Sequence, residues 1–296
     1  RTARAARGGG RGTAPGGAGS ENCRGKTVTG VAFCGAGRIG IIHAGNLVRQ
    51  PGVRLKCIAD VNRAAAVALA AKHRAEVRAA DAIFAEEAIN AIVIASSTDT
   101  HADLIQRGAA AGKAIFCEKP VDLDLVRARA CAQAVGKAGV ICMIGFQRRY
   151  DPTFAALKAR LASGEIGDPE MLVVTSRDPG APPLEYLATS GGIFKDMLIH
   201  DFDIFRWILD DEALTLYATG SCLTDQAIAG ANDIDSAAVT IRTRRGRIAQ
   251  INTSRRAAYG YDQRFEVLGS KGMLQAGNHK PTEVFAHTAA SVCEDK

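Results

Sequence analysis

The strongest constraint on the fold is a glycine-rich turn, GAGRIG, at residues 35–40. A β-type run, TVTGVAFC at 27–34, ends directly in this turn, and a helical segment at 41–50 follows it. A second β-type run, VRLKCIAD, ends at Asp60, 20 residues after the third glycine. Strand, G-x-G-x-x-G turn, helix, second strand and terminal acid together are typical of a βαβ unit that binds a dinucleotide. The alternative is an ordinary βαβ turn.

Each part of this unit has a physical role in dinucleotide binding. Gly35 permits the tight turn, Gly37 lets backbone N–H groups approach a pyrophosphate, and Gly40 lets the helix pack closely against the strand. The helix N-terminus brings partial positive charge to the phosphates. Asp60 would accept hydrogen bonds from ribose hydroxyls and would repel a 2′-phosphate. NAD is therefore favoured over NADP, although the nearby Arg63 leaves NADP open.

Strands and helices continue to alternate as far as residue 145. The expected elements are helices at 65–73, 102–111 and 123–139 and strands at 91–96, 114–117 and 140–145. Continuously apolar runs between helices predict a parallel sheet with helices on both faces, and ligands bind beyond the carboxyl ends of such strands. Any one of the polar residues there could be an ordinary loop residue, but they all fall on the same edge: Ser97, Thr98, His101, Glu118, Lys119, Gln147 and Arg148.

The character of the chain changes after residue 145. A helix is expected at 152–163, a strand at 171–177 and a loop rich in proline and glycine at 178–183. Period-two alternation then predicts four strands, at 215–223, 238–243, 247–253 and 264–268, with a hairpin turn at Arg245-Gly246. The fold class is therefore an α/β Rossmann domain at 27–146 and an α+β domain at 147–296 with a mostly antiparallel open sheet. One face of that sheet is expected to pair with another subunit.

The segment 190–209, SGGIFKDMLIHDFDIFRWIL, reads from Ile193 onward as one largely buried helix. On it Asp196 and His200 are four residues apart, which places them on successive turns of one face. A carboxylate that orients an imidazole is a common way to build a general base. A satisfied structural Asp–His pair is the alternative. A metal is not expected, because no third ligand lies at useful spacing and Lys119 supplies positive charge.

Charge and cysteine spacing exclude several classes of function. The net charge is +6, but residues 1–26 carry +5 of it, which leaves no basic surface for nucleic acid. No apolar run approaches a membrane span of roughly 18 residues. The eight cysteines include no C-x-x-C pair, which favours a reducing, cytoplasmic setting. The Arg- and Gly-rich residues 1–26 are expected to form a disordered extension, with an organelle transit peptide as the alternative.

Five segments together resemble one enzyme family: GAGRIG, STDTHADL, CEKP, GFQRRYDP and SGGIFKDMLIHDFD. From about residue 28 to about residue 276 the chain resembles the Gfo/Idh/MocA oxidoreductases, the family of glucose–fructose oxidoreductase and inositol dehydrogenase. Within it, the segments at 175–183 and 254–274 are similar to those of its inositol dehydrogenases. The CEKP segment and the D-x-x-x-H helix are more specific to the family than the glycine turn is.

The resemblance implies NAD-dependent oxidation of a cyclic polyol, here myo-inositol to its 2-keto product, by a homotetramer. It implies that His200 is the general base, that Asp196 fixes its tautomer, and that Lys119 holds the hydroxyl beside the nicotinamide. The implied residues are Lys119, Asp196 and His200 for catalysis, Arg148, Met197 and Tyr261 with Tyr259 for further substrate contacts, and Gly35, Gly37, Arg38, Ile39, Gly40, Asp60, Ser97, Thr98, His101, Glu118, Lys119 and Gln147 for the cofactor.

Two other functions stay open on the sequence. One is a related dehydrogenase of another sugar or cyclic diol, because pocket shape sets that choice. The other is a catalytically silent NAD-binding protein. The family continues through a further helix that helps to wall the substrate pocket, whereas this sequence ends at Lys296. A fragment and a divergent protein with a weakened site would both account for that difference.

Overall fold

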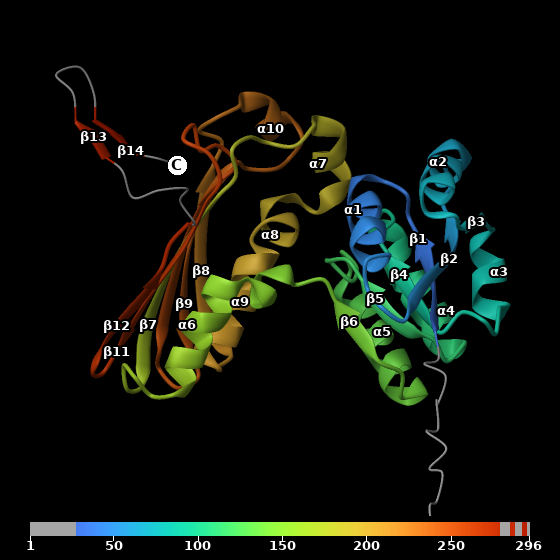
Figure 1. Cartoon of the computed structure of the whole chain (residues 1–296). Helices are drawn as coiled ribbons and strands as arrows, with labels where there is room; N and C mark the ends of the chain where they lie inside the picture. Colours follow the sequence, from blue (N-terminus) through green and yellow to red (C-terminus); the bar gives the residue numbers. More distant parts are fainter. Residues whose placement is uncertain (1–27, 279–284, 288–291, 295–296) are drawn as a thin grey trace, which may run out of the picture.

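The computed structural model describes residues 28–278, 285–287 and 292–294, which form two large sheets and the helices around them (Figure 1). The expected extension at 1–26 lies outside the described residues. Residues 29–144 build the first sheet and residues 169–276 the second. Among the described residues, no helix is long and apolar enough to cross a membrane.

The first sheet has six strands in the order β3-β2-β1-β4-β5-β6, and every neighbouring pair is parallel. The strand order reverses between β1 and β4, and in such sheets dinucleotides bind beyond the carboxyl ends of the strands at this point. Its strands are β1 (Thr29–Cys34), β2 (Val53–Ala59), β3 (Glu76–Val77), β4 (Ala91–Ile94), β5 (Ala114–Cys117) and β6 (Cys142–Ile144).

Helices cover both faces of this sheet because its strands are apolar on both sides. On β1, Val31 and Phe33 belong to a core with residues of α1 and α2, whereas Ala32 and Cys34 belong to a core with residues of α3, α4 and α5. The helices are α1 (Arg38–Leu47), α2 (Arg63–His73), α3 (Ala80–Ala85), α4 (Thr98–Ala110) and α5 (Leu125–Ala138). The sequence missed the short β3 and α3 and placed the starts of α1 and α4 three or four residues too late.

The second sheet is mixed, with six strands in the order β12-β11-β7-β10-β9-β8. The predicted mostly antiparallel sheet is confirmed: four of the five strand pairs are antiparallel, and β7 and β10 at its centre run parallel. Its strands are β7 (Pro169–Arg177), β8 (Ala213–Ser221), β9 (Ser236–Thr243), β10 (Ile248–Ser254), β11 (Asp262–Gly269) and β12 (Gly272–Ala276). The expected turn at Gly246 connects β9 and β10. A separate pair, β13 (Phe285–His287) and β14 (Val292–Glu294), is antiparallel.

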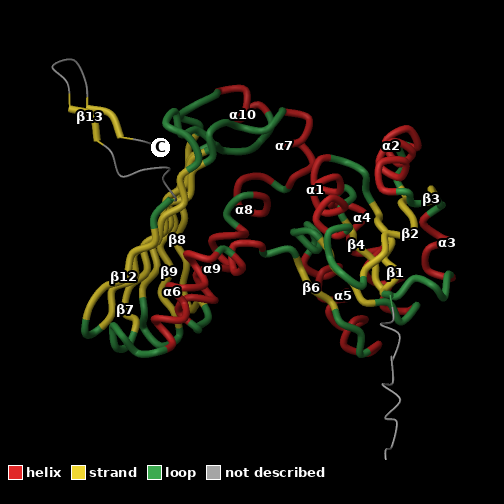
Figure 2. Tube along the Cα trace, viewed as in Figure 1, coloured by secondary structure: helices red, strands yellow, loops and turns green. Residues whose placement is uncertain are grey.

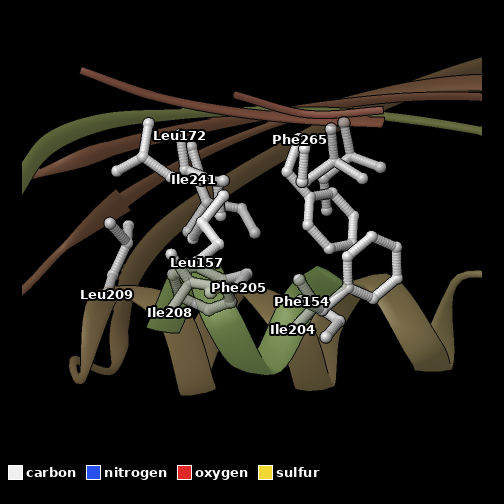
Figure 3. Packing of buried hydrophobic residues seen from close by; sticks show 14 of the residues in the cluster. Phe154, Leu157, Leu172, Ile204, Phe205, Ile208, Leu209, Ile241 and Phe265 are labelled. Carbon is white, nitrogen blue, oxygen red and sulfur yellow. The ribbon is translucent and has the colours of Figure 1, made fainter. Parts of the chain in front are cut away.

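Two helices, α6 (Pro152–Ala162) and α9 (Ile199–Leu209), pack on one face of the second sheet (Figures 1 and 3). The strands alternate, so that Ile241 and Phe265 point into this core while their neighbours point away. The rings of Phe154 and Phe265 lie 4.2 Å apart between centroids. No described helix covers the opposite face of the sheet (Figure 1).

The segment predicted as one central helix is two helices, α8 (Gly192–Asp196) and α9, and a further helix, α7 (Leu184–Ser190), precedes them. In the chain all three helices lie between β7 and β8, and in space α7 and α8 lie between the two sheets (Figure 2). The chain leaves α8 because the N–H of Leu198 donates to the carbonyl of Ile193 at 2.8 Å, a wider turn than an α-helix makes. Asp196 therefore ends one helix and His200 begins the next, so they do not lie on successive turns of one helix. The short connections are η1 (Gln147–Tyr150), a 3-10 helix, and α10 (Gln226–Gly230).

Candidate active site

The glycine turn after β1 has the shape that a dinucleotide needs. A Cβ on Gly35, whose φ is +114°, would lie 2.4 Å from the backbone of Ala95, and one on Gly40 would lie 2.2 Å from the carbonyl oxygen of Gly35. Both glycines are therefore fixed by close packing. A Cβ on Gly37 would meet no atom within 4 Å, so the turn is open on that side. An open backbone at the N-terminus of α1 fits a pyrophosphate.

Asp60 lies directly after β2 and is tied to the same turn. Its Oδ2 accepts the N–H of Ala36 at 2.6 Å, and its Oδ1 accepts the N–H of Asn62 at 2.7 Å. The carboxylate is therefore held at the edge of the crevice, where the sequence placed it as the acceptor for ribose hydroxyls. The turn and this acid together fit NAD.

Four other residues predicted for the cofactor differ in how available they are. Ser97 and Thr98 begin α4 with side chains that are at least partly exposed. Glu118 follows β5, and its Oε1 lies 2.6 Å from Nε2 of His43 on α1. His101 is buried, and its ring nitrogens lie 2.7 and 3.1 Å from the carbonyl oxygens of Pro120 and Ser96. An N–H of the ring can donate to one of these carbonyls, and the buried ring packs α4 against the chain after β5 instead of facing a cofactor.

Lys119 connects the two halves of the molecule. It follows β5 at the carboxyl edge of the first sheet, and its Nζ donates to Asp196 at the end of α8, to Oδ1 at 3.0 Å and to the backbone carbonyl at 2.8 Å. Both side chains are less than a fifth exposed. An ion pair this sheltered is stronger than one on the surface because water screens it less. The Lys119 amine, at the edge of the first sheet, therefore contacts the Asp196 carboxylate at the end of α8.

Asp196 has two further partners, Tyr186 on α7 and Arg255 just beyond β10. The Tyr186 hydroxyl donates to Oδ1 at 2.9 Å, and Arg255 Nη1 lies 3.9 Å from Oδ2. Burial and the neighbouring Asp196 carboxylate raise the pKa of Tyr186, so its hydroxyl stays protonated and can donate. The sequence did not single out either residue.

His200, in the first turn of α9, is a neutral imidazole. Burial, together with the positive charges of Arg148 and Lys119, lowers its pKa from 6.5 to about 3. Its Nδ1 is buried without a hydrogen-bond partner, and Phe146 packs its ring edge-on. Among the described residues no hydrogen bond joins Asp196 to His200, so Asp196 does not fix the His200 tautomer as the sequence suggested. Because α8 ends at Asp196 and α9 begins at Ile199, the two side chains are held by different helices.

A buried polar network lies next to His200. Arg148 on η1 is 7% exposed and forms an ion pair with the fully buried Asp201. The Oγ of Ser176 on β7 accepts from Arg148 at 3.4 Å and from Gln263 at 2.9 Å. Arg148 was predicted to contact a substrate directly, yet its guanidinium is largely taken up by these partners. Its positive charge still acts on His200.

Asp178 also belongs to this part of the molecule, although the sequence placed it only in a loop. Burial raises its pKa, and the charges of Arg148, Arg255, Asp196 and Lys119 act on it. Its backbone is fixed by the N–H that it donates to the carbonyl of Ser254 at 3.0 Å. A half-buried carboxyl beside the Lys119–Asp196 pair is available as a hydrogen-bond partner for a polar ligand.

The remaining predicted substrate residues surround this cluster. Tyr261 is half exposed and lies within electrostatic range of Arg148 and Asp178. Met197 is buried, and its sulfur lies 3.4 Å from the hydroxyl of Thr253 on β10. Its side chain therefore packs against that strand. The Tyr259 hydroxyl donates to Asp262 at 2.7 Å. In the described part of the chain, no three His, Cys, Asp or Glu side chains gather as they would around a metal ion.

Two family models together match most of the described chain. Residues 29–146 match an oxidoreductase family with an NAD-binding Rossmann fold, and residues 154–275 match the GFO/IDH/MocA C-terminal domain. The chain belongs to the Gfo/Idh/MocA family. The expectation from the five sequence segments is therefore confirmed.

Family members of similar sequence include inositol dehydrogenases. An inositol 2-dehydrogenase of Rhizobium meliloti is 51% identical over 250 residues, which are 84% of this chain and 76% of that protein. A myo-inositol dehydrogenase from Corynebacterium glutamicum, whose crystal structure is known, is 46% identical in sequence to this chain. The two structures match with a TM-score of 0.84 over 91% of this chain and 80% of that one. A scyllo-inositol dehydrogenase from Lactobacillus casei, solved with NAD(H) and scyllo-inositol, is 27% identical with a TM-score of 0.83, covering 90% and 82%.

Proposed function

We propose that this Gfo/Idh/MocA protein oxidises myo-inositol to 2-keto-myo-inositol with NAD as the hydride acceptor. The observation that carries the proposal is the meeting of Lys119 with Asp196, with the neutral imidazole of His200 in the same cluster. The inositol dehydrogenases among its relatives support the choice of a cyclic polyol.

Three side chains divide the chemistry between them. The neutral His200 accepts the proton of the reacting hydroxyl, because a depressed pKa leaves its imidazole unprotonated across the physiological range. The ammonium of Lys119 donates to the same hydroxyl oxygen and stabilises negative charge as it develops there. Asp196 holds that ammonium through its Oδ1 and its backbone carbonyl. When bound, NAD supplies the acceptor for the hydride from the ring carbon.

The cofactor site belongs to the first sheet. The open turn at Gly37 and the N-terminus of α1 would hold the pyrophosphate, and Asp60 would hold the adenosine ribose. Ser97, Thr98 and Glu118 line the same carboxyl edge toward Lys119. Asp178 and Tyr261 would face the hydroxyls that do not react, and substitutions at these two positions would change the preference between polyols rather than the reaction. Arg148 would act on the reaction through its charge beside His200.

The test is the formation of NADH, followed by absorbance at 340 nm with a panel of inositols, aldoses and cyclic diols. Reduction of NAD with myo-inositol, and not with aldoses, is the expected result. Oxidation of another polyol only would identify a related dehydrogenase, a choice that the scyllo-inositol dehydrogenase among the similar structures keeps in view. NAD binding with no oxidation in the whole panel would identify a catalytically silent protein and refute the proposal.

We also propose a cytoplasmic homotetramer that forms through the second sheet. The face of this sheet away from α6 and α9 carries exposed apolar side chains on four strands: Tyr217, Ile248, Leu268 and Met273. A second copy of the chain would cover them. Light scattering on the purified protein is expected to give four times the monomer mass, and a monomer would contradict this assembly.

A further inference from the structure

Arg255 is the largest fully buried side chain in the described structure, at 2% exposure. It lies one residue beyond β10, on the face that Ile251 and Thr253 present to the core, so the alternation of the strand directs it inward. Its backbone N–H donates to the carbonyl of Asp235 at 2.7 Å, which fixes the start of the side chain. A buried guanidinium is costly unless carboxylates surround it.

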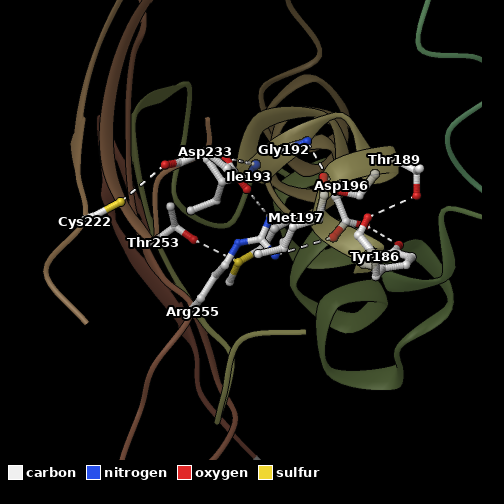
Figure 4. Close-up of polar contacts among 12 residues, drawn as sticks. Tyr186, Thr189, Gly192, Ile193, Asp196, Met197, Cys222, Asp233, Thr253 and Arg255 are labelled. Carbon is white, nitrogen blue, oxygen red and sulfur yellow. Dashed lines mark hydrogen bonds and ion pairs between the residues drawn. The ribbon is translucent and has the colours of Figure 1, made fainter. Parts of the chain in front are cut away.

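The guanidinium joins two carboxylates at opposite ends of α8 (Figure 4). Its Nη2 donates to Asp233 Oδ2 at 3.2 Å, and its Nη1 forms an ion pair with Asp196 Oδ2 at 3.9 Å. Asp233 in turn accepts the N–H of Ile193 at 2.9 Å through its other oxygen. Asp233 therefore holds the beginning of α8, and Arg255 carries that restraint to the carboxylate at its end.

The sequence at the start of α8 is adapted to this arrangement. A Cβ on Gly192 would lie 2.8 Å from Asp233 Oδ1, so any larger residue would push the carboxylate away from the helix. The φ of Gly192 is +76°, which also favours glycine. The absence of a side chain at Gly192 thus lets the Asp233 carboxylate reach the backbone.

The two oxygens of Asp196 have separate partners. Lys119 and Tyr186 both donate to Oδ1, while Oδ2 faces Arg255. Rotation of this carboxylate would lose the hydrogen bonds at Oδ1 or move Oδ2 away from the guanidinium, 3.9 Å from it. The orientation of Oδ1 toward the amine of Lys119 therefore depends on what holds Oδ2.

We propose that Arg255 is a positioning residue for the reaction: braced by Asp233, it holds Asp196 Oδ2 so that Oδ1 stays on Lys119. This inference rests on the proposed function for its catalytic readout. Arg255 acts on the reacting hydroxyl only through Asp196 and Lys119. Loss of the Arg255 side chain should reduce turnover without weakening the binding of NAD, whose proposed site is the glycine turn of the first sheet.

The test is a double-mutant cycle on kcat with NAD and myo-inositol, using Arg255→Gln, Asp196→Asn and the double variant. Arg255→Gln is expected to lower kcat roughly 10- to 100-fold with the KM for NAD unchanged, because small displacements of a supporting group cost about that much. The double variant should be no slower than Asp196→Asn, since Arg255 acts through that side chain. Arg255→Lys should recover part of the loss. The neighbouring Arg256→Gln is the matched control and should behave as wild type, because Arg256 is exposed.

Two results would overturn the inference: a wild-type kcat in Arg255→Gln, or losses in kcat that multiply in the double variant. If Arg255→Gln does not fold, Asp233→Asn, which removes the charge that braces Arg255, replaces it in the cycle with the same criteria. If the wild type oxidises no polyol, the proposed function fails separately. The cycle is then read from urea midpoints, where the effects of Arg255 and Asp196 must be non-additive, and additive shifts would refute the contact.

Discussion

His200 makes the stability of the protein depend on pH in a direction that can be calculated. Its pKa is about 3 in the folded protein and near its ordinary value of 6.5 in the unfolded chain. Between these two values the unfolded chain binds a proton that the folded protein does not. The free energy of unfolding should therefore fall as pH decreases below 6.5, and this contribution is absent above it.

The size of the effect follows from the two pKa values. At about pH 5 the medium is 1.5 units below the pKa of the unfolded histidine, and each unit is worth about 1.4 kcal/mol. His200 should thus cost about 2 kcal/mol of stability at about pH 5 relative to about pH 7.5. Its burial and the positive charges of Arg148 and Lys119 are the causes.

The assay is urea unfolding of the wild type and of His200→Asn at both pH values. Other titrating groups contribute nearly equally to both proteins, so the difference between the two pH dependences isolates His200. On acidification the free energy of unfolding of the wild type should fall by about 2 kcal/mol more than that of the variant. Equal decreases in the free energy of unfolding of the two proteins would show that His200 titrates normally in the folded state. That result would refute the claim that His200 is a neutral base.

Three further substitutions test other parts of the structure. Gly40→Ala should raise the Kd for NAD about tenfold or more, measured by calorimetry, because its Cβ would lie 2.2 Å from the carbonyl oxygen of Gly35 and displace α1. Asp60→Ser should narrow the ratio of kcat/KM for NAD over NADP, since it removes the charge that repels a 2′-phosphate. Phe265→Ala, in the core of the second sheet at 2% exposure, should cost about 3–5 kcal/mol in urea unfolding, whereas Val126→Ala, at an exposed position on α5, should cost little.

Local patterns were enough to predict most of the fold. The glycine turn and the continuous apolar runs fixed the first sheet, because close packing at Gly35 and Gly40 and burial of both faces leave few other structures. Alternation identified the main strands of the second sheet. It could not show that β7 and β10 are parallel neighbours, because pairing between distant strands leaves no local signal.

The active site was harder to predict because its contacts join distant residues. Lys119 and Asp196 are 77 residues apart, and the Asp233 carboxylate that holds the start of α8 is 40 residues from Ile193. The apolar periodicity of 190–209 favoured a single helix, and only the widened turn after Ile193 breaks it. The sequence also shows two adjacent arginines after β10, and only the direction of the strand reveals that Arg255 is buried.

The convergence of Lys119 and His200 on one hydroxyl is tested most directly by a crystal structure of the protein with NAD and myo-inositol. We expect one ring hydroxyl oxygen to lie roughly 2.6–3.2 Å from both Lys119 Nζ and a ring nitrogen of His200, with its carbon facing the nicotinamide. An inositol bound away from these two residues, or with Lys119 and His200 on different hydroxyls, would contradict the mechanism.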